Sequence, residues 1–227
     1  MVSLVAPCYN NLRHVNNLIT SYLKWGDKNS ELIIIDDASN DGTYDTLMDW
    51  KEVKDSQHIR VLKSPSRKRV GHTVLYDWGI DQARGDVVGI LHADMIIGKD
   101  YIKNMLKHLK PGTVVCATRV EPPLHPPGKE KIILDFGLDF DTLDVNAFDN
   151  FVDQAQIEFK DLSSQGMFAP WILMKKDWEI AGGHDHVFAP FPFEDSDIFQ
   201  RWILNGFTLI QSRDAFVYHL TCRGHKW

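Results

Sequence analysis

The chain has 227 residues, of which 44% are hydrophobic, enough to form one globular core. Its formal net charge of -6 gives no electrostatic basis for a nucleic-acid or anionic-membrane partner. Cys8, Cys116 and Cys222 are odd in number and far apart, which argues against a disulfide framework and a thiolate zinc site. The apolar start, 1–6, is shorter than a signal-peptide core, and no run approaches the roughly 18 apolar residues of a membrane span. We therefore expect a soluble, cytoplasmic protein without a transmembrane segment.

Short apolar runs in the first half predict buried strands, and helical stretches separate them. The runs cover residues 2–6, 32–35, 60–62, 87–91 and 114–117. Between the first two, Val15, Leu18, Ile19 and Tyr22 recur at helical spacing. Such alternation is typical of an α/β fold with a mostly parallel central sheet flanked by helices. These sheets bind ligands beyond the carboxyl ends of their strands, so the polar residues there are candidates for a site.

The second half of the chain is less regular. Residues 121–128 (EPPLHPPG) predict an exposed loop, because proline disfavours both helix interiors and central strands. The acid-rich residues 135–161 show no strong period, whereas 167–174 predict a strand and 195–205 an amphipathic helix. We expect this half to complete the same sheet, in a single domain that covers residues 1–227.

Two adjacent acids, Asp36 and Asp37, follow the strand predicted at 32–35. Two carboxylates at a strand end are costly unless a ligand or hydrogen-bond donors engage them. One interpretation is that they bind a ligand. The other is that they cap the next helix and anchor the turn together with the polar residues 39–41.

The strand predicted at 87–91 delivers His92 and Asp94 to its end, where alternate residues face the same side. Mg²⁺ and Mn²⁺ favour carboxylate oxygen and need few protein ligands when a diphosphate supplies the others. Asp94 suits that role, with His92 as a neighbour of the metal or of a ribose. A structural histidine–aspartate pair is the alternative.

Three acids, Glu194, Asp195 and Asp197, lie at the start of the helix predicted at 195–205. Acids in a first turn complement the helix dipole, which is a structural reason for their presence. The aromatic and proline residues at 188–193 could also partly desolvate one carboxylate and favour it as a general base. The residues alone do not separate Glu194 from Asp195 in that role.

The motifs, in their order and spacing, resemble glycosyltransferase family two, which has the GT-A fold. They are VSLVAPCYNN (2–11), IIIDDASNDGT (33–43), the glycine, helix, ARGD and LHAD of 71–94, GGHDHVF (182–188) and EDSDIFQR (194–201). The resemblance implies a metal-assisted, inverting transfer of a sugar from a nucleotide-diphosphate donor, with UDP favoured. The acceptor would be a carbohydrate or another hydroxyl compound. It also implies a nucleotide-sugar-binding half at about 1–118 and an acceptor-side half at about 119–227.

The resemblance also assigns residues to the nucleotide. They are Pro7, Tyr9, Asn10, Asp36, Asp37, Arg69, His92 and Arg223, with Lys63 and Arg67 as further basic candidates. In the tail 221–227, His225 and Lys226 accompany Arg223 as groups able to meet a diphosphate. A solvated terminus is the alternative for this tail.

The family's metal motif is usually Asp-x-Asp, whereas His92-Ala93-Asp94 keeps only the second acid. The resemblance implies Mn²⁺ or Mg²⁺ as cofactor, with Asp94 and His219 as its ligands and His225 as the alternative to His219. For His92 both a metal and a ribose contact stay open. The family's Glu–Asp pair implies Asp195 as the catalytic base and Glu194 as its support.

Other functions share parts of this pattern. A nucleotidyltransferase also binds a nucleotide on an α/β sheet, but it normally has a glycine-rich basic loop where this chain has APCYNNLRH. The missing GxGxxG motif argues against a dinucleotide-dependent dehydrogenase. A non-catalytic nucleotide-sugar or glycan-binding module is the remaining alternative, because His92 departs from the family's metal motif.

Overall fold

The computed structural model describes residues 1–124, 127–166, 168–189 and 194–220. Within these ranges the strands are β1 (Val2–Cys8), β2 (Ser30–Asp36), β3 (Ile59–Lys63), β4 (Val87–Ile90), β5 (Met95–Ile97), β6 (Thr113–Glu121), β7 (Lys131–Ile133), β8 (Ser163–Gln165), β9 (Trp171–Met174) and β10 (Thr208–His219). They form one sheet in the order β3-β2-β1-β4-β9-β6-β10-β5, with β7 beside β6 and β8 beside β10.

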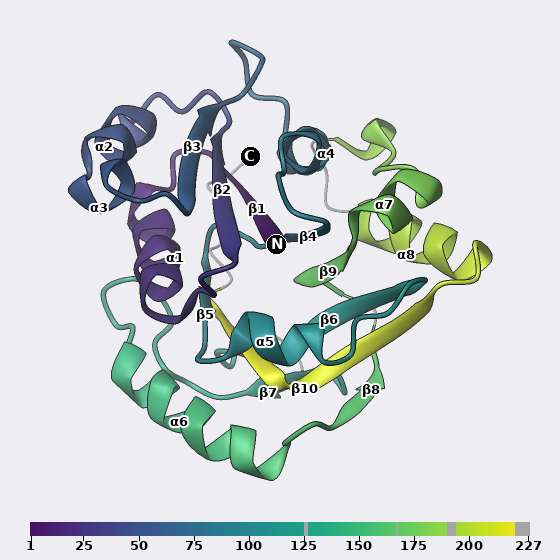
Figure 1. The fold of residues 1–227 in the computed structure, drawn as a ribbon. Coiled ribbons are helices and arrows are strands. Elements are labelled where there is room, and N and C mark those ends of the chain that lie inside the picture. Colours follow the sequence, from purple (N-terminus) through teal and green to yellow (C-terminus); the bar gives the residue numbers. More distant parts are fainter. Residues whose placement is uncertain (125–126, 167, 190–193, 221–227) are drawn as a thin grey trace.

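Helices cover this sheet (Figure 1). They are α1 (Leu12–Trp25), α2 (Thr43–Asp49), α3 (Lys51–Lys54), α4 (His72–Asp81), α5 (Tyr101–Leu106), α6 (Val145–Glu158), α7 (Lys175–Ala181), the 3-10 helix η1 (His186–Phe188) and α8 (Glu194–Leu204). Among the helices of the described ranges, none has the length and apolar character that a membrane crossing requires.

Strands β1 to β4 pair in parallel, and β1, β2 and β4 are buried on both faces. β1 lies between β2 and β4, and β2 pairs with β3, all in parallel. Leu4 of β1 packs into the core on the α1 side, whereas its neighbour Val5 packs into the core on the α4 side. Burial on both faces explains why these strands are continuous apolar runs in the sequence. At Gly79 of α4, a Cβ atom would lie 2.3 Å from Val5 Cγ1, so glycine allows the helix to approach β1 closely.

The second half adds antiparallel strands to a sheet that is otherwise parallel, as expected. β9 is antiparallel to both β4 and β6, and β10 is parallel to β6 but antiparallel to β5 and β8. The predicted strand at 167–174 is present only as 171–174. Apolar runs indicate that a segment is a buried strand but not its direction, which depends on the partners that distant parts of the chain supply.

Helix α6 occupies part of the acid-rich region for which the sequence shows no strong period. Asp144 caps it, accepting a hydrogen bond from Ala147 N at 2.9 Å. Phe148, Val152 and Ala155 form its buried face and pack against the β10 side of the sheet. Their i, i+4, i+7 spacing is a helical signal, but the polar residues between them weaken it.

Candidate active site

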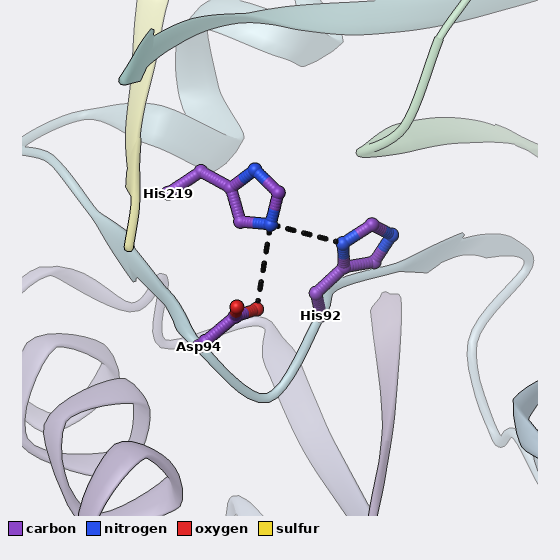
Figure 2. Close-up of side chains that lie close together, drawn as sticks. All are labelled: His92, Asp94 and His219. Carbon is purple, nitrogen blue, oxygen red and sulfur yellow. Dashed lines mark hydrogen bonds and ion pairs between the residues drawn. The ribbon is translucent and has the colours of Figure 1, made fainter. Parts of the chain in front are cut away.

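Two strand ends bring His92, Asp94 and His219 together (Figure 2). His92 and Asp94 lie in the turn between β4 and β5, and His219 ends β10, where it pairs with Met95 in the antiparallel register. His219 Nε2 lies 3.3 Å from His92 Nδ1 and 3.5 Å from Asp94 Oδ1. One ligand atom from each of the three residues lies within 4.8 Å of the others. The cluster therefore offers two imidazole nitrogens and one carboxylate oxygen to a single metal ion.

Glu121, at the end of β6, orients the histidine of this cluster. Its Oε1 lies 3.1 Å from His219 Nδ1, and its Oε2 accepts a hydrogen bond from Lys131 Nζ at 2.8 Å. When Nδ1 carries the proton, it donates to Glu121 and leaves the lone pair of Nε2 facing Asp94, an arrangement common among metal-binding histidines. Glu121 was not among the sequence-predicted residues, because the prolines of 121–128 predict an exposed loop, whereas Glu121 ends β6 and is 2% exposed.

The two histidines of the cluster have pKa values shifted in opposite directions. Burial and, after it, the neighbouring His219 together lower the pKa of His92 to about 3, so His92 is neutral at pH 7. Burial also disfavours the charged form of His219, but the carboxylates of Asp94 and Glu121 outweigh it and raise its pKa to about 9. For Glu121, hydrogen bonds from His219 and Lys131 outweigh burial and lower the pKa to about 2. Without a metal, the protonated His219 therefore forms an ion pair with Asp94, and a cation bound there would take the place of the proton on His219 Nε2.

The acids that begin α8 have different surroundings. Glu194 Oε1 lies 2.6 Å from His72 Nε2 at the start of α4. Although burial opposes it, this contact lowers the pKa of Glu194. Burial raises the pKa of Asp195, and the charge of Glu194 raises it further. Asp195 thus has the properties of a proton acceptor, whereas Glu194 is engaged with His72. The catalytic assignment itself stays a prediction.

The loop before α8 is held in place by the neighbouring helices. Asp77 of α4 contacts His184 Nδ1 at 2.6 Å and His186 Nε2 at 3.0 Å. At Gly183, a Cβ atom would lie 2.4 Å from Asp77 Oδ2, so glycine is needed for this close contact. Arg201 of α8 donates to the carbonyl oxygen of Gly183 at 2.8 Å. The GGHDH motif (182–186) therefore joins α8, through Arg201, to α4, through Asp77.

A pocket of about 530 Å³ lies beyond the ends of β2 and β3. Of the sequence-predicted residues, those that line it are Asp36, Lys63 and Arg67. Asp36 is 3% exposed, and its Oδ1 is buried without a hydrogen-bond partner among the described residues. A buried carboxylate oxygen without a donor is costly, so a ligand hydroxyl or amide at this point would stabilise it. Lys63 Nζ lies 4.2 Å from the ring centroid of Tyr44, another lining residue.

The sequence left open whether Asp36 and Asp37 bind a ligand or anchor the turn, and Asp37 has a structural role. Its Oδ1 accepts from Val70 N at 2.9 Å and its Oδ2 from Gly71 N at 2.8 Å. These bonds hold the loop that leads into α4. Both oxygens are therefore occupied, whereas in Asp36 only Oδ2 accepts a hydrogen bond, from Ser39 N at 3.1 Å.

The other nucleotide candidates also have neighbours within the protein. Asn10 and Asn40 exchange two hydrogen bonds, which join the loops after β1 and β2. Arg69 stacks over the ring of Tyr9 at 4.6 Å, and Pro7 is buried within β1. Arg223, together with the other basic residues of 221–227, lies outside the described residues.

Solved glycosyltransferases share this fold. A mannosyltransferase of Pyrobaculum calidifontis, solved with GDP-Man and Mn²⁺, matches 98% of this chain and 58% of its own, with a TM-score of 0.69 and 19% identity. GalNAc-T7, solved with UDP, GalNAc and Mn²⁺, matches 96% of this chain and 43% of its own, with a TM-score of 0.70 and 15% identity. The fold is therefore GT-A, that of glycosyltransferases which use nucleotide sugars.

Within that class, the family model described as Glycosyl transferase family 2 matches residues 3–164, and the chain belongs to this family. A putative teichuronic acid biosynthesis glycosyltransferase of Bacillus subtilis is 28% identical over 109 residues, which are 48% of this chain and 42% of that protein. A Methanococcus voltae dolichyl N-acetyl-alpha-D-glucosaminyl phosphate 3-beta-D-2,3-diacetamido-2,3-dideoxy-beta-D-glucuronosyltransferase is 23% identical over 108 residues, 47% of this chain and 33% of its own length. The matched segments span less than half of either relative.

Proposed function

We propose that this chain transfers a sugar from a nucleoside-diphosphate donor, with UDP favoured, to a hydroxyl acceptor, with metal assistance and inversion at the anomeric carbon. The observation that carries the proposal is the His92–Asp94–His219 cluster at the strand ends of a family 2 chain. Relatives in this fold class have been solved with UDP or GDP-Man and Mn²⁺.

The donor set fits a divalent cation. His92, Asp94 and His219 supply three ligand atoms within 4.8 Å of one another, which leaves further coordination positions for diphosphate oxygens. Two imidazoles beside one carboxylate favour Mn²⁺ over Mg²⁺, because Mg²⁺ prefers all-oxygen ligands. A cation bound there would act as a Lewis acid that offsets the negative charge of the leaving diphosphate.

The residues of the chain account for the remaining chemistry. Asp36 offers its buried, unpartnered oxygen to the nucleoside. Asp195, whose pKa burial raises, takes the proton of the acceptor hydroxyl. The acceptor oxygen forms its bond to the anomeric carbon as the bond to the diphosphate breaks, and displacement from the opposite face inverts that centre. The proton ends on Asp195 and the nucleoside diphosphate leaves.

Thermal unfolding with nucleotide and metal tests the proposal. A ligand that binds only the native state at about 100 times its Kd adds roughly 2.7 kcal/mol to the free energy of unfolding. We expect UDP to raise the unfolding midpoint more with Mn²⁺ than with EDTA, and more than GDP or dTDP does. Asp94→Ala should remove the metal-dependent increment. Asp86→Ala is the matched control, because that side chain is 98% exposed and does not belong to the cluster.

Equal stabilisation by UDP in Mn²⁺ and in EDTA would contradict metal assistance. A full metal response in Asp94→Ala would remove that residue from the proposed ligand set. UDP-sugar turnover in the presence of acceptors distinguishes an enzyme from a binding module, since the latter would show the stabilisation without release of UDP.

A further inference from the structure

A second hollow, a groove of about 1190 Å³, lies on the second half of the chain. It shares no lining residue with the pocket at Asp36. Its walls come from β8, the start of β10 and the end of α8, while Arg119 of β6 and the loop before β7 close one side. The roles proposed above for the nucleotide and the metal do not use this groove.

The charges of the groove differ in sign from those of the protein as a whole. Arg119, Lys129 and Arg213 line it, against the single acid Glu130. The chain has a formal net charge of -6, so this concentration of positive charge is local. A basic groove on an acidic protein attracts anionic ligands at short range without attracting polyanions to the whole surface.

Arg119 links the groove to the candidate metal site. Its Nε lies 3.5 Å from Oε1 of Glu121, the residue that orients His219. Its guanidinium also lies over the ring of Phe168, 5.0 Å from the centroid. Beyond the ion pair with Glu121, the guanidinium donates no hydrogen bond to the described residues. Its planar terminal NH₂ groups suit the two oxygens of a carboxylate or phosphate.

The far side of the groove combines charge with apolar surface. Arg213 Cζ lies 5.5 Å from the ring centroid of Phe159, and its Nη1 donates to the carbonyl oxygen of Lys129 at 3.3 Å. Two further lining residues are apolar and accessible, with Leu162 52% exposed and Ile203 46% exposed. Sugar rings present apolar C–H faces and polar edges, so a groove lined by both apolar and basic side chains matches a charged glycan better than a neutral or purely apolar ligand.

We propose that this groove binds the acceptor and that the acceptor is an anionic glycan, one that carries carboxylate or phosphate groups. The inference rests on the proposed glycosyl transfer. Arg119 binds the acid group nearest the reaction centre, and Lys129 and Arg213 bind a more distant one. The acceptor thereby reaches from the groove toward Asp94 and His219.

The test is a titration of the full chain, with UDP and Mn²⁺ present, against two charged oligosaccharides and their neutral counterparts. One is a glucuronic-acid oligosaccharide with its carboxyl-reduced form, and the other is a phosphorylated oligosaccharide with its phosphatase-treated form. We expect at least one charged member to bind about tenfold or more tightly than its neutral form, through charge-assisted contacts. The preference should weaken between 50 and 300 mM NaCl. Which pair shows it identifies the acid group.

The double variant Lys129→Ala/Arg213→Ala should lose most of this preference while keeping the UDP–Mn²⁺ increment in thermal stability. Lys28→Ala/Lys176→Ala is the control, because it removes the same charge at exposed positions outside the groove. Equal affinity for charged and neutral forms, no binding of any of the four, or an unchanged preference in the double variant would each overturn the proposal. If the wild-type protein does not bind UDP and Mn²⁺, the proposed function is contradicted instead. Failure of the acceptor proposal and failure of the proposed function are thus distinguishable.

Discussion

Substituting Asp195 and Glu194, the two acids at the start of α8, one at a time should distinguish a catalytic from a structural role for each. Asp195→Asn keeps the shape of the side chain but removes the proton acceptor, so transfer should fall by about 10²- to 10⁴-fold. Its effect on stability should stay below about 1 kcal/mol, because in the first turn of α8 the substitution removes only the interaction of the charge with the helix dipole. Affinity for UDP and Mn²⁺ should be unchanged.

Glu194→Gln should act on stability and on the pH profile. It replaces a carboxylate that lies 2.6 Å from His72 Nε2, and loss of a charged hydrogen bond costs about 1.5–3 kcal/mol. For a chain of this size that lowers the unfolding midpoint by about 3–12 °C. The charge of Glu194 also contributes, after burial, to the raised pKa of Asp195. A base must be ionised, so the rate falls as pH drops through its pKa. Removing the neighbouring charge therefore moves this acid limb to lower pH.

The assay is kcat/KM for transfer across pH in wild type and in both variants, together with calorimetric midpoints. Asp197→Asn is the matched control, because Asp197 belongs to the same helical turn but pairs with Arg201 at 2.7 Å. It should lose only about 0.5 kcal/mol and no activity. Unimpaired transfer by Asp195→Asn, or an acid limb that stays in place in Glu194→Gln, would refute the assignment of Asp195 as base.

Three further predictions, with four substitutions, concern the sheet, the acid pair Asp36–Asp37 and the metal cluster. Glu31 accepts hydrogen bonds from Ser3, Arg84 N and Arg60, which outweigh burial and lower the pKa of Glu31. The contribution of Glu31 to the free energy of unfolding is therefore complete above the unfolded-state pKa. It disappears as pH falls through the folded-state pKa. Glu31→Gln should therefore cost about 1.5–3 kcal/mol at pH 7 in denaturant titrations, and the gap to wild type should close in acid; an equal gap at both pH values would contradict this. Asp37→Ala should cost roughly 1–3 kcal/mol of stability by leaving two backbone donors unpaired. Asp36→Ala should mainly weaken UDP binding in calorimetric titrations. The reverse pattern would contradict a structural role for Asp37 and a nucleotide-binding role for Asp36. Glu121→Gln should weaken Mn²⁺ binding about 10- to 100-fold by loosening His219, measured by electron paramagnetic resonance; unchanged affinity would show that Glu121 has no part in the site.

The family and much of the fold were predictable because their signals are local. Strands β1, β2 and β4 are buried on both faces, so their apolar runs stand out in the sequence. The glycosyltransferase motifs occur at the ends of such elements, and the family match supports that interpretation. Helix α6 escaped prediction because only one narrow face is buried and acidic residues surround it. The antiparallel strands of the second half were not predicted, because strand direction depends on pairing between distant segments.

The sequence by itself determined which residue types stand at the strand ends and at the start of α8; the tertiary structure decided what each of them does. Asp36 and Asp37 are adjacent and chemically identical, yet Asp37 holds the backbone of Gly71, 34 residues away, while Asp36 retains an unpartnered oxygen. Glu194 is joined to His72 across 122 positions and Glu121 to His219 across 98. The role of a carboxylate depends on which donors and charges occupy it and on how far burial removes it from water. Those partners come from other elements of the fold, so no local pattern in the sequence encodes them.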